Sequence, residues 1–393
     1  MTATLEPVRL NAAKIAVGVT FTVNGLAYAG WLARAPAVRD DLGLTAAGFG
    51  LLLLCMSGAA IAAIPLAGPL VQRLGPARAV LLGSMSVVLG LIALATGTAT
   101  GTIWLAGLGL VLAGMGNSTW DVSMNVEGAD VERRLDRTIL PRFHAGFSLG
   151  TVLGAGVSAL LAAVGVPVSV QLTLTAVLAA AVMALAVRRF TPWSPLPAGE
   201  KPAMSVREAW REPRTIMIGL ILLGFGFTEG VANDWLAIAL VDAYHASETI
   251  GAVGFGAFVT AMTVSRLFGG VAIERWGRVR TLRGTVVLGV AGVLLVVTNI
   301  GVPVALVGAL LWGAGASLGF PVGMSAAADD PVRAALRLSV AGSIGYGAFL
   351  AGPPLIGLVA EDLGVLQAIL CVFVALGIGL FASRAAKPLA EIR

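Results

Sequence analysis

The feature that most constrains this chain is a set of three long stretches without a charged side chain. Ala79–Trp120, Phe143–Val187 and Gly284–Ala328 run for 42, 45 and 45 residues. Turn-forming residues interrupt the stretches near their middles, at 96–102, 164–167 and 299–303. Because a helix of about 20 apolar residues crosses a bilayer core, each stretch is expected to form two spanning helices joined by a turn.

Six single apolar runs complete an expected set of twelve transmembrane helices. The first run, Ile15–Ala33, has 19 residues and no small-residue cleavage site, which indicates a retained helix and not a signal peptide. The other runs are 47–71, 215–241, 250–273, 338–360 and 363–383. The chain is 58% hydrophobic and only 12% charged, whereas a soluble domain carries about 25% charged residues. The alternation typical of a β-barrel is absent, so we expect an all-α, multi-pass membrane protein.

Lys and Arg residues are distributed unevenly among the expected loops. The N-terminus, the even-numbered loops and the C-terminus hold nearly all of them, and the other side has only Arg34 and Arg39. The positive-inside rule therefore predicts that both termini are cytoplasmic. The same bias accounts for the net charge of +5 without a nucleic-acid partner. The abundance of Ala and Gly suits close helix packing and suggests a bacterial cytoplasmic membrane.

The chain also repeats itself with an offset near 200 residues. The segment GPLVQRLGPAR at 68–78 matches GVAIERWGRVR at 270–280. Between the repeats lies a Pro-rich, basic linker in which Ser205 and Glu208 have the spacing of a capping box, so a short helix at the membrane surface is expected. We predict an N-terminal six-helix bundle at 1–190, a cytoplasmic linker at 191–214 and a C-terminal six-helix bundle at 215–393.

The duplicated loop resembles the signature loop of the major facilitator superfamily, and the resemblance covers the whole chain. It implies two pseudo-symmetric six-helix bundles around a central cavity. It also implies that the loop residues latch the cytoplasmic ends of the bundles when the cavity faces outward. The second copy keeps the acid of the loop, Glu274, whereas the first copy has Gln72. The expected gating residues are Gly68, Arg73, Gly75, Arg78, Gly270, Glu274, Arg275 and Gly277.

Within that superfamily, DVSMNVEG in the fourth helix and ANDW in the seventh look most like the fucose-permease-like sugar transporters. In that group the fourth helix carries an acid four residues before an asparagine, and Asp121 and Asn125 match this spacing. The acid that the group has in its first helix is missing here. The first helix of this chain has Asn24 and Tyr28 instead. The resemblance implies transport of a sugar or a sugar derivative.

Asp121 ends the first charge-free stretch and is the main candidate for proton coupling. Asn117, Asp121 and Asn125 are spaced at i, i+4 and i+8, on one stripe of a helix. An isolated carboxylate in hydrocarbon is costly, so the stripe is expected to face the bundle interior or a wet cavity. Burial favours the protonated form of the carboxyl group. The group can therefore take up a proton on one side of the membrane and release it on the other. His144 is expected at a similar depth, as a possible partner of Asp121, or else the pair is purely structural.

The seventh helix holds a second polar group. Glu229 and Asn233 are four residues apart on one face, and Asp234 is turned about 100° further round. We expect Glu229 near the middle of the membrane as a coupling or binding residue, and Asp234 as an outer cap or gate. Arg266 in the next helix either balances an acid or extends its guanidinium toward the cytoplasm, and the extension is the favoured expectation.

Other polar and aromatic side chains complete the expected site. The proton-coupling candidates are Asp121, Glu229 and His144. The substrate-binding candidates are Asn24, Tyr28, Trp31, Asn117, Trp120, Asn125, Asn233, Trp235, Trp312 and Tyr346. For Trp31 and Trp235 an anchoring role at the membrane interface is the alternative. Asp234, Glu127 and Arg142 join the gating set, the last two as an ion pair near the cytoplasm.

The sequence thus predicts a secondary transporter, not an enzyme, that moves a small polar solute and is coupled to protons. The alternatives are uncoupled facilitation, proton-driven efflux of amphipathic or cationic compounds, and a membrane sensor that does not transport. We expect a monomer in a lipid bilayer, with no cofactor, no metal and no nucleic-acid partner. Cys55 and Cys371 lie in apolar runs, and His144 and His245 have no ligand spacing.

Overall fold

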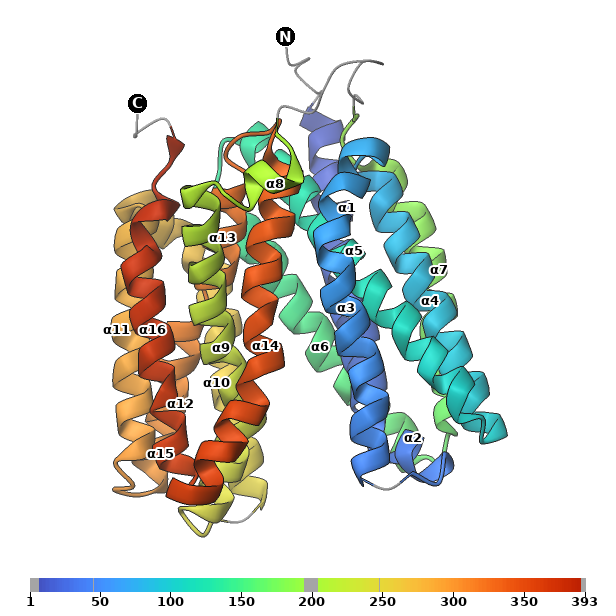
Figure 1. The fold of residues 1–393 in the computed structure, drawn as a ribbon, viewed down its shortest axis with the longest axis vertical. Helices are drawn as coiled ribbons and strands as arrows, with labels where there is room; N and C mark the ends of the chain where they lie inside the picture. The colour runs from blue at the N-terminus through green and yellow to red at the C-terminus, as the bar shows by residue number, and fades with distance from the viewer. Residues whose placement is uncertain (1–6, 45, 194–203, 247, 390–393) are drawn as a thin grey trace. The chain divides into compact units, whose positions relative to one another are not determined.

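The computed structural model describes residues 7–44, 46–193, 204–246 and 248–389, and this part of the chain is built of helices (Figure 1). It forms two compact units. Unit 1 comprises Met1–Asp136, Gly146–Met204 and Pro331–Ser339, and unit 2 comprises Arg137–Ala145, Ser205–Asp330 and Val340–Arg393. Each unit therefore includes a short segment from the opposite half of the sequence.

The helices of the first half follow the expected runs. The predicted turns at 96–102 and 164–167 are confirmed, because α4 ends at Thr100 before α5 begins at Ile103, and α6 ends at Ala163 before α7 begins at Val168. The left-handed conformation of Gly101 ends the first helix of the first pair. The elements are α1 (Pro7–Leu32), α2 (Ala35–Asp41), α3 (Ala46–Leu74), α4 (Pro76–Thr100), α5 (Ile103–Leu135), α6 (Leu140–Ala163), α7 (Val168–Ala186) and η1 (Val187–Arg189).

The second half repeats this order, with two interruptions. The turn at 299–303 is confirmed, but two of the expected helices are divided into shorter pieces, α12 with α13 and α15 with α16. The elements are α8 (Val206–Ala209), α9 (Pro213–Asp242), α10 (Glu248–Trp276), α11 (Arg278–Val297), α12 (Val302–Ala316), α13 (Gly319–Ala327), α14 (Ala334–Leu363), α15 (Val365–Ile369), α16 (Cys371–Ala382) and η2 (Ser383–Ala386).

Ten segments in the described part of the chain are long and apolar enough to cross a bilayer. They confirm an all-α, multi-pass membrane fold, while the count of twelve spans stays a prediction. The helices α5 and α14 are outside this set of ten, although they have 33 and 30 residues. In α5 the reason is visible in the sequence, because the polar stripe around Asp121 lowers its hydropathy.

Glycines bring pairs of neighbouring helices into backbone contact. In α4 and α5, a Cβ added at Gly90 would lie 2.5 Å from the carbonyl oxygen of Gly109, and one at Gly109 would lie 2.6 Å from that of Gly90. In α11 and α12, Gly292 and Gly308 face each other in the same way. Small residues at such positions let helices approach closely and gain van der Waals contact. The repeat seen in the sequence is therefore also a repeat in packing.

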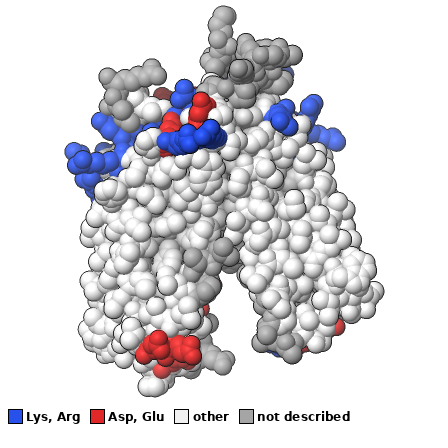
Figure 2. Space-filling view, viewed as in Figure 1, with Lys and Arg blue, Asp and Glu red and all other residues white. Residues whose placement is uncertain are grey.

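The linker is visible only at its two ends, since residues 194–203 lie outside the described part. The predicted capping box is confirmed: the backbone N–H of Glu208 donates to the Ser205 hydroxyl, and the Glu208 carboxylate accepts from the backbone N–H of Ser205. The helix that it starts, α8, is a single turn. Within each unit, Lys and Arg side chains gather at one end of the helices and the flanks are almost free of charge (Figure 2).

A buried arginine fixes the end of α1 in unit 1. The Arg34 guanidinium donates to the Gln171 side-chain oxygen at 2.8 Å and to the carbonyl of Val166 at 2.9 Å. Gln171 in turn donates to the Ser158 hydroxyl and to the carbonyl of Gly30. Arg34 is 9% exposed, so a residue that the charge pattern assigned to a solvated loop instead joins α1, α6 and α7.

Candidate functional site

Unit 1 contains a buried polar cluster formed by α1 and α5. The side-chain amide of Asn24 donates to the Asn117 side-chain oxygen at 3.0 Å, which joins the two helices. One turn further along α5, the Asn125 amide donates to the backbone carbonyl of Asp121 at 2.9 Å and to its carboxylate at 3.3 Å. Asp121 is 7% exposed and Asn125 is fully buried. The structure therefore brings together the predicted stripe and the predicted polar residue of the first helix.

The aromatic residues predicted for unit 1 do not share one surface. Tyr28 is exposed, whereas Trp31 is buried and its indole N–H has no hydrogen-bond acceptor among the described residues. Trp120 is fully buried, and its backbone packs against Gly83 of α4. Its indole N–H, like that of Trp31, is buried without an acceptor among the described residues, so its expected substrate role stays a prediction.

Unit 2 contains a buried ion pair between α9 and α10. The Arg266 guanidinium lies 2.8 Å from the Glu229 carboxylate, with side-chain exposures of 4% for the arginine and 17% for the acid. Its Nε also donates to the backbone carbonyl of Ser317 at 3.0 Å. The structure thus supports the alternative that Arg266 balances an acid, and the favoured extension toward the cytoplasm is wrong. An acid on α9 and a carbonyl between α12 and α13 hold it inside the unit, and sequence periodicity shows neither.

The break between α12 and α13 explains why the Ser317 carbonyl is free to accept this bond. Proline has no N–H, so Pro321 cannot donate to the carbonyl four residues earlier, which is that of Ser317. The helix stops at Ala316 and starts again at Gly319. Pro321, within the third charge-free stretch, is thus the one feature of the sequence that indicates this helix break.

A row of aromatic side chains lies in the same unit. The His144 ring meets Phe320 edge to face with ring centres 6.1 Å apart. Phe320 meets Tyr346 at 5.9 Å, and Tyr346 meets Phe349 at 5.9 Å. Phe349 reaches α9, where a Cβ added at Gly230 would lie 3.3 Å from its ring. Two predicted residues, His144 and Tyr346, are therefore neighbours in a row that continues toward Glu229.

The remaining candidates of α9 and α12 have different surroundings. Trp312 is fully buried, and its indole N–H donates to the backbone carbonyl of Thr228 at 3.1 Å, so it ties α12 to α9 and is no longer assigned to the substrate. Asn233 and Asp234 are exposed. Trp235 is half-buried, and its indole N–H is buried without an acceptor in the described part of the chain, as in Trp31.

The two signature loops have the same backbone shape and different surroundings. Gly75 has φ 79° and ψ 161°, and Gly277 has φ 78° and ψ 158°. The Trp193 side chain covers Gly75, whereas a Cβ added at Gly277 would meet nothing within 4 Å. Arg73 and Arg78 are exposed.

Each signature segment packs against a piece of the opposite half of the sequence. In unit 2, the Glu274 carboxylate accepts from the backbone N–H of Thr138 at 3.0 Å, and a Cβ added at Gly270 would lie 2.4 Å from the Thr138 carbonyl. In unit 1, a Cβ added at Gly68 would lie 2.7 Å from the carbonyl of Ala335. The Arg275 guanidinium lies 5.9 Å from the ring centre of its neighbour Trp276.

The acids at the end of α5 bind the start of the linker. The Glu127 carboxylate accepts from the backbone N–H of Thr191 at 2.6 Å, and the Asp130 carboxylate accepts from the Thr191 hydroxyl at 3.0 Å. Glu127 thus has a partner within unit 1, and its expected pair with Arg142 of unit 2 stays a prediction. In unit 2, Arg142 is exposed and its Nε approaches the carbonyl of Leu267 at 3.4 Å.

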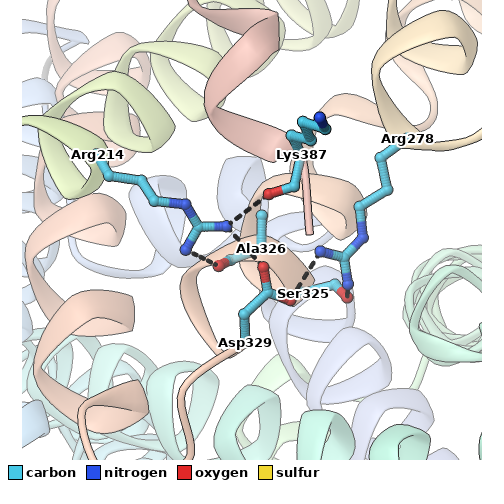
Figure 3. Close-up of polar contacts among 6 residues, drawn as sticks. All are labelled: Arg214, Arg278, Ser325, Ala326, Asp329 and Lys387. Carbon is cyan, nitrogen blue, oxygen red and sulfur yellow. Dashed lines mark hydrogen bonds and ion pairs between the residues drawn. The ribbon is translucent and has the colours of Figure 1, made fainter. Parts of the chain in front are cut away.

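A charged network, which the sequence analysis missed, joins the helix ends at one end of unit 2 (Figure 3). The Asp329 carboxylate accepts from Arg214 at 2.6 Å and from Arg278 at 2.7 Å. Arg214 also donates to the backbone carbonyls of Ala326 and Lys387. Because both arginines stand in the first turn of a helix, where positive charge is unfavourable, Asp329 compensates them and ties α9 and α11 to the end of α13.

The chain is similar in sequence to a transporter family and to bacterial membrane proteins. The profile of the Major Facilitator Superfamily matches residues 17–236. An uncharacterized transporter of Sinorhizobium fredii, y4wD, is 32% identical over 93% of this chain and 94% of its own length. The membrane protein MosC of Rhizobium meliloti is 26% identical over 92% of this chain and 87% of its own length.

Solved structures agree with the fold. The fucose:proton symporter FucP of E. coli superposes with a TM-score of 0.80 and 14% identity, over 95% of this chain and 98% of its own. The human organic anion transporter MFSD10 superposes with a TM-score of 0.75 and 18% identity, over 98% and 100%. At these identities the likeness concerns the fold.

Proposed function

This chain belongs to the Major Facilitator Superfamily of transporters, and from that premise we propose that it moves a small polar solute across the cytoplasmic membrane by alternating access. The solute is driven by a proton gradient, and Asp121 is the residue that takes up and releases the proton. The observation that carries this proposal is a carboxylate, 7% exposed, in the interior of the 33-residue helix α5. A buried acid in such a helix is costly and is usually functional.

Polar side chains within each unit support a solute rich in hydroxyl groups. Asn117 lies one turn before the acid on α5, and its side chain is hydrogen-bonded to that of Asn24 on α1. Trp31 and Trp235, which are related by the repeat, each keep an indole N–H without an acceptor in the described chain. Such N–H groups suit sugar hydroxyls, and FucP is a proton symporter for a sugar.

The signature loops are proposed to act as the gate. The bond from Thr138 to Glu274 joins a segment of the first half of the chain to the second signature loop, and it can break and form again during transport. The first loop, with Gln72 in place of an acid, supplies close backbone packing at Gly68.

Substituting the coupling acid tests the proposal. In vesicles containing the purified protein, a pH difference of one unit is expected to drive about a tenfold accumulation of a solute carried with one proton. A thermal-shift screen of fucose, other monosaccharides and lipophilic cations selects the solutes for this assay. Asp121→Asn is expected to abolish accumulation while exchange of labelled for unlabelled solute continues.

The matched control is Asp41→Asn, which neutralises an exposed acid. It is expected to accumulate solute as the unchanged protein does. Equal loss of accumulation and exchange in Asp121→Asn would contradict the coupling role and indicate solute binding. Hits among lipophilic cations alone would favour efflux.

A further inference from the structure

The Glu229–Arg266 pair has one fixed and one displaceable member. Arg266 is 4% exposed and is held by the Ser317 carbonyl as well as by the acid. Glu229 is 17% exposed, and within the described residues Arg266 is its only polar partner. Removing the acid therefore breaks one interaction, whereas removing the guanidinium also leaves the buried Ser317 carbonyl unsatisfied.

This asymmetry decides which kind of ligand can enter the pair. A cation would have to replace Arg266 beside Glu229, and the unsatisfied carbonyl makes that exchange costly. An anion would have to replace only Glu229 beside Arg266. The guanidinium is already oriented for a carboxylate, because it binds one, and Arg forms strong, directional bonds to planar carboxylates.

The row of aromatic rings extends from this point. Phe349 lies against Gly230, the residue after Glu229, and Phe320 follows Ser317 by three residues. A ligand whose carboxylate sits on Arg266 would therefore have an apolar, aromatic surface close to its remaining atoms.

We propose that Arg266 binds the carboxylate of the transported solute and that Glu229 is the internal carboxylate which the solute displaces. The solute class is then small organic acids, such as sugar acids. The assignment of this anion as the transported solute rests on the proposed function, but the anion site in unit 2 can be tested without transport.

Chemical rescue provides that test. Glu229→Ala removes the internal carboxylate and leaves Arg266 buried without it, so the thermal midpoint of the purified protein is expected to fall. Added sodium acetate is expected to restore the midpoint by occupying the vacated position. Acetamide has the same shape without the charge, and is expected to need at least about tenfold higher concentration for any effect, because bonds between charged groups are stronger.

Two further variants keep the result interpretable. Glu229→Ala combined with Arg266→Gln removes both charges and is expected to fold without any response to acetate. If Glu229→Ala alone does not fold, Glu229→Gln serves instead. Its amide is a weaker partner for Arg266, so acetate should stabilise it at lower concentration than it stabilises the unchanged protein.

Each outcome decides between the proposals. Equal rescue by sodium chloride or by acetamide, or no rescue at all, overturns the carboxylate site. Rescue by inorganic phosphate but not by acetate overturns the assignment to carboxylates. Rescue by acetate without proton-driven accumulation of any solute would keep the anion site and reject the proposed function. Proton-driven accumulation of neutral sugars without rescue by acetate would support the proposed function and reject the anion site.

Discussion

Gly75 and Gly277 show what a single residue determines in this fold. Each precedes a helix with φ near 80° and ψ near 160°, a combination that is essentially restricted to glycine. The chain leaves one helix and enters the next in a backbone conformation that is strained for any residue with a Cβ. The repeated glycine of the signature loop is thus a backbone requirement, independent of any gating role.

Alanine substitutions separate backbone strain from side-chain contact. Gly277→Ala is expected to destabilise the protein by about 1–3 kcal/mol, from strain alone, because nothing lies within 4 Å of its Cβ. Gly75→Ala is expected to lose more, since its Cβ would also meet Trp193. Thermal unfolding in detergent measures both. The control Gly256→Ala, in a helix with open space, should be neutral or stabilising; equal effects of all three would refute the argument.

At the scale of elements, small residues and one proline determine how the helices meet. Gly90 and Gly109 let α4 and α5 touch along their backbones. Pro321 divides a spanning segment into α12 and α13 and frees the carbonyl that holds Arg266. Both features are local in sequence, yet each acts on a helix elsewhere in the chain.

Two glycines of α5 provide a matched pair for the packing. A Cβ at Gly109 would lie 2.6 Å from backbone atoms of α4, whereas one at Gly107 would meet only a Leu52 methyl at 3.7 Å. Gly109→Ala is expected to destabilise by about 1–3 kcal/mol through overpacking. Gly107→Ala should instead stabilise by up to about 1 kcal/mol through helix propensity. Midpoints that shift in the same direction would contradict the close approach of these helices.

For the whole molecule, the distribution of charge predicts the orientation in the membrane. Basic residues are concentrated at the termini and in the even-numbered loops. An inner leaflet with anionic lipids and the insertion machinery both favour their retention in the cytoplasm. The orientation is a property of all loops together and of no single one.

Cysteine labelling in intact cells tests the orientation. After Cys55→Ala and Cys371→Ala, a single cysteine is introduced as Asp362→Cys or as Lys387→Cys, at two exposed positions. A membrane-impermeant maleimide is expected to label the variant at 362 directly. The variant at 387 should react only after the membrane is permeabilised. The opposite labelling pattern would contradict the predicted orientation and place the C-terminus outside the cytoplasm.

The sequence alone was enough for the class of fold, the turn positions at 96–102, 164–167 and 299–303, the repeat and the capping box at Ser205. These depend on hydrophobic length and local turn chemistry, which residues close in sequence specify. The stripe with Asp121 was also correct, because helical spacing places i and i+4 on one face.

Only the tertiary structure decided which side chains are partners. Arg266 forms an ion pair with Glu229, and the Glu127 carboxylate accepts a hydrogen bond from Thr191. The Trp312 indole donates to a backbone carbonyl inside unit 2. In each case the partner lies on another helix or loop. Periodicity fixes the direction of a side chain on its own helix, but the crossing and depth of neighbouring helices depend on packing between them. The candidate anion site arises from that packing.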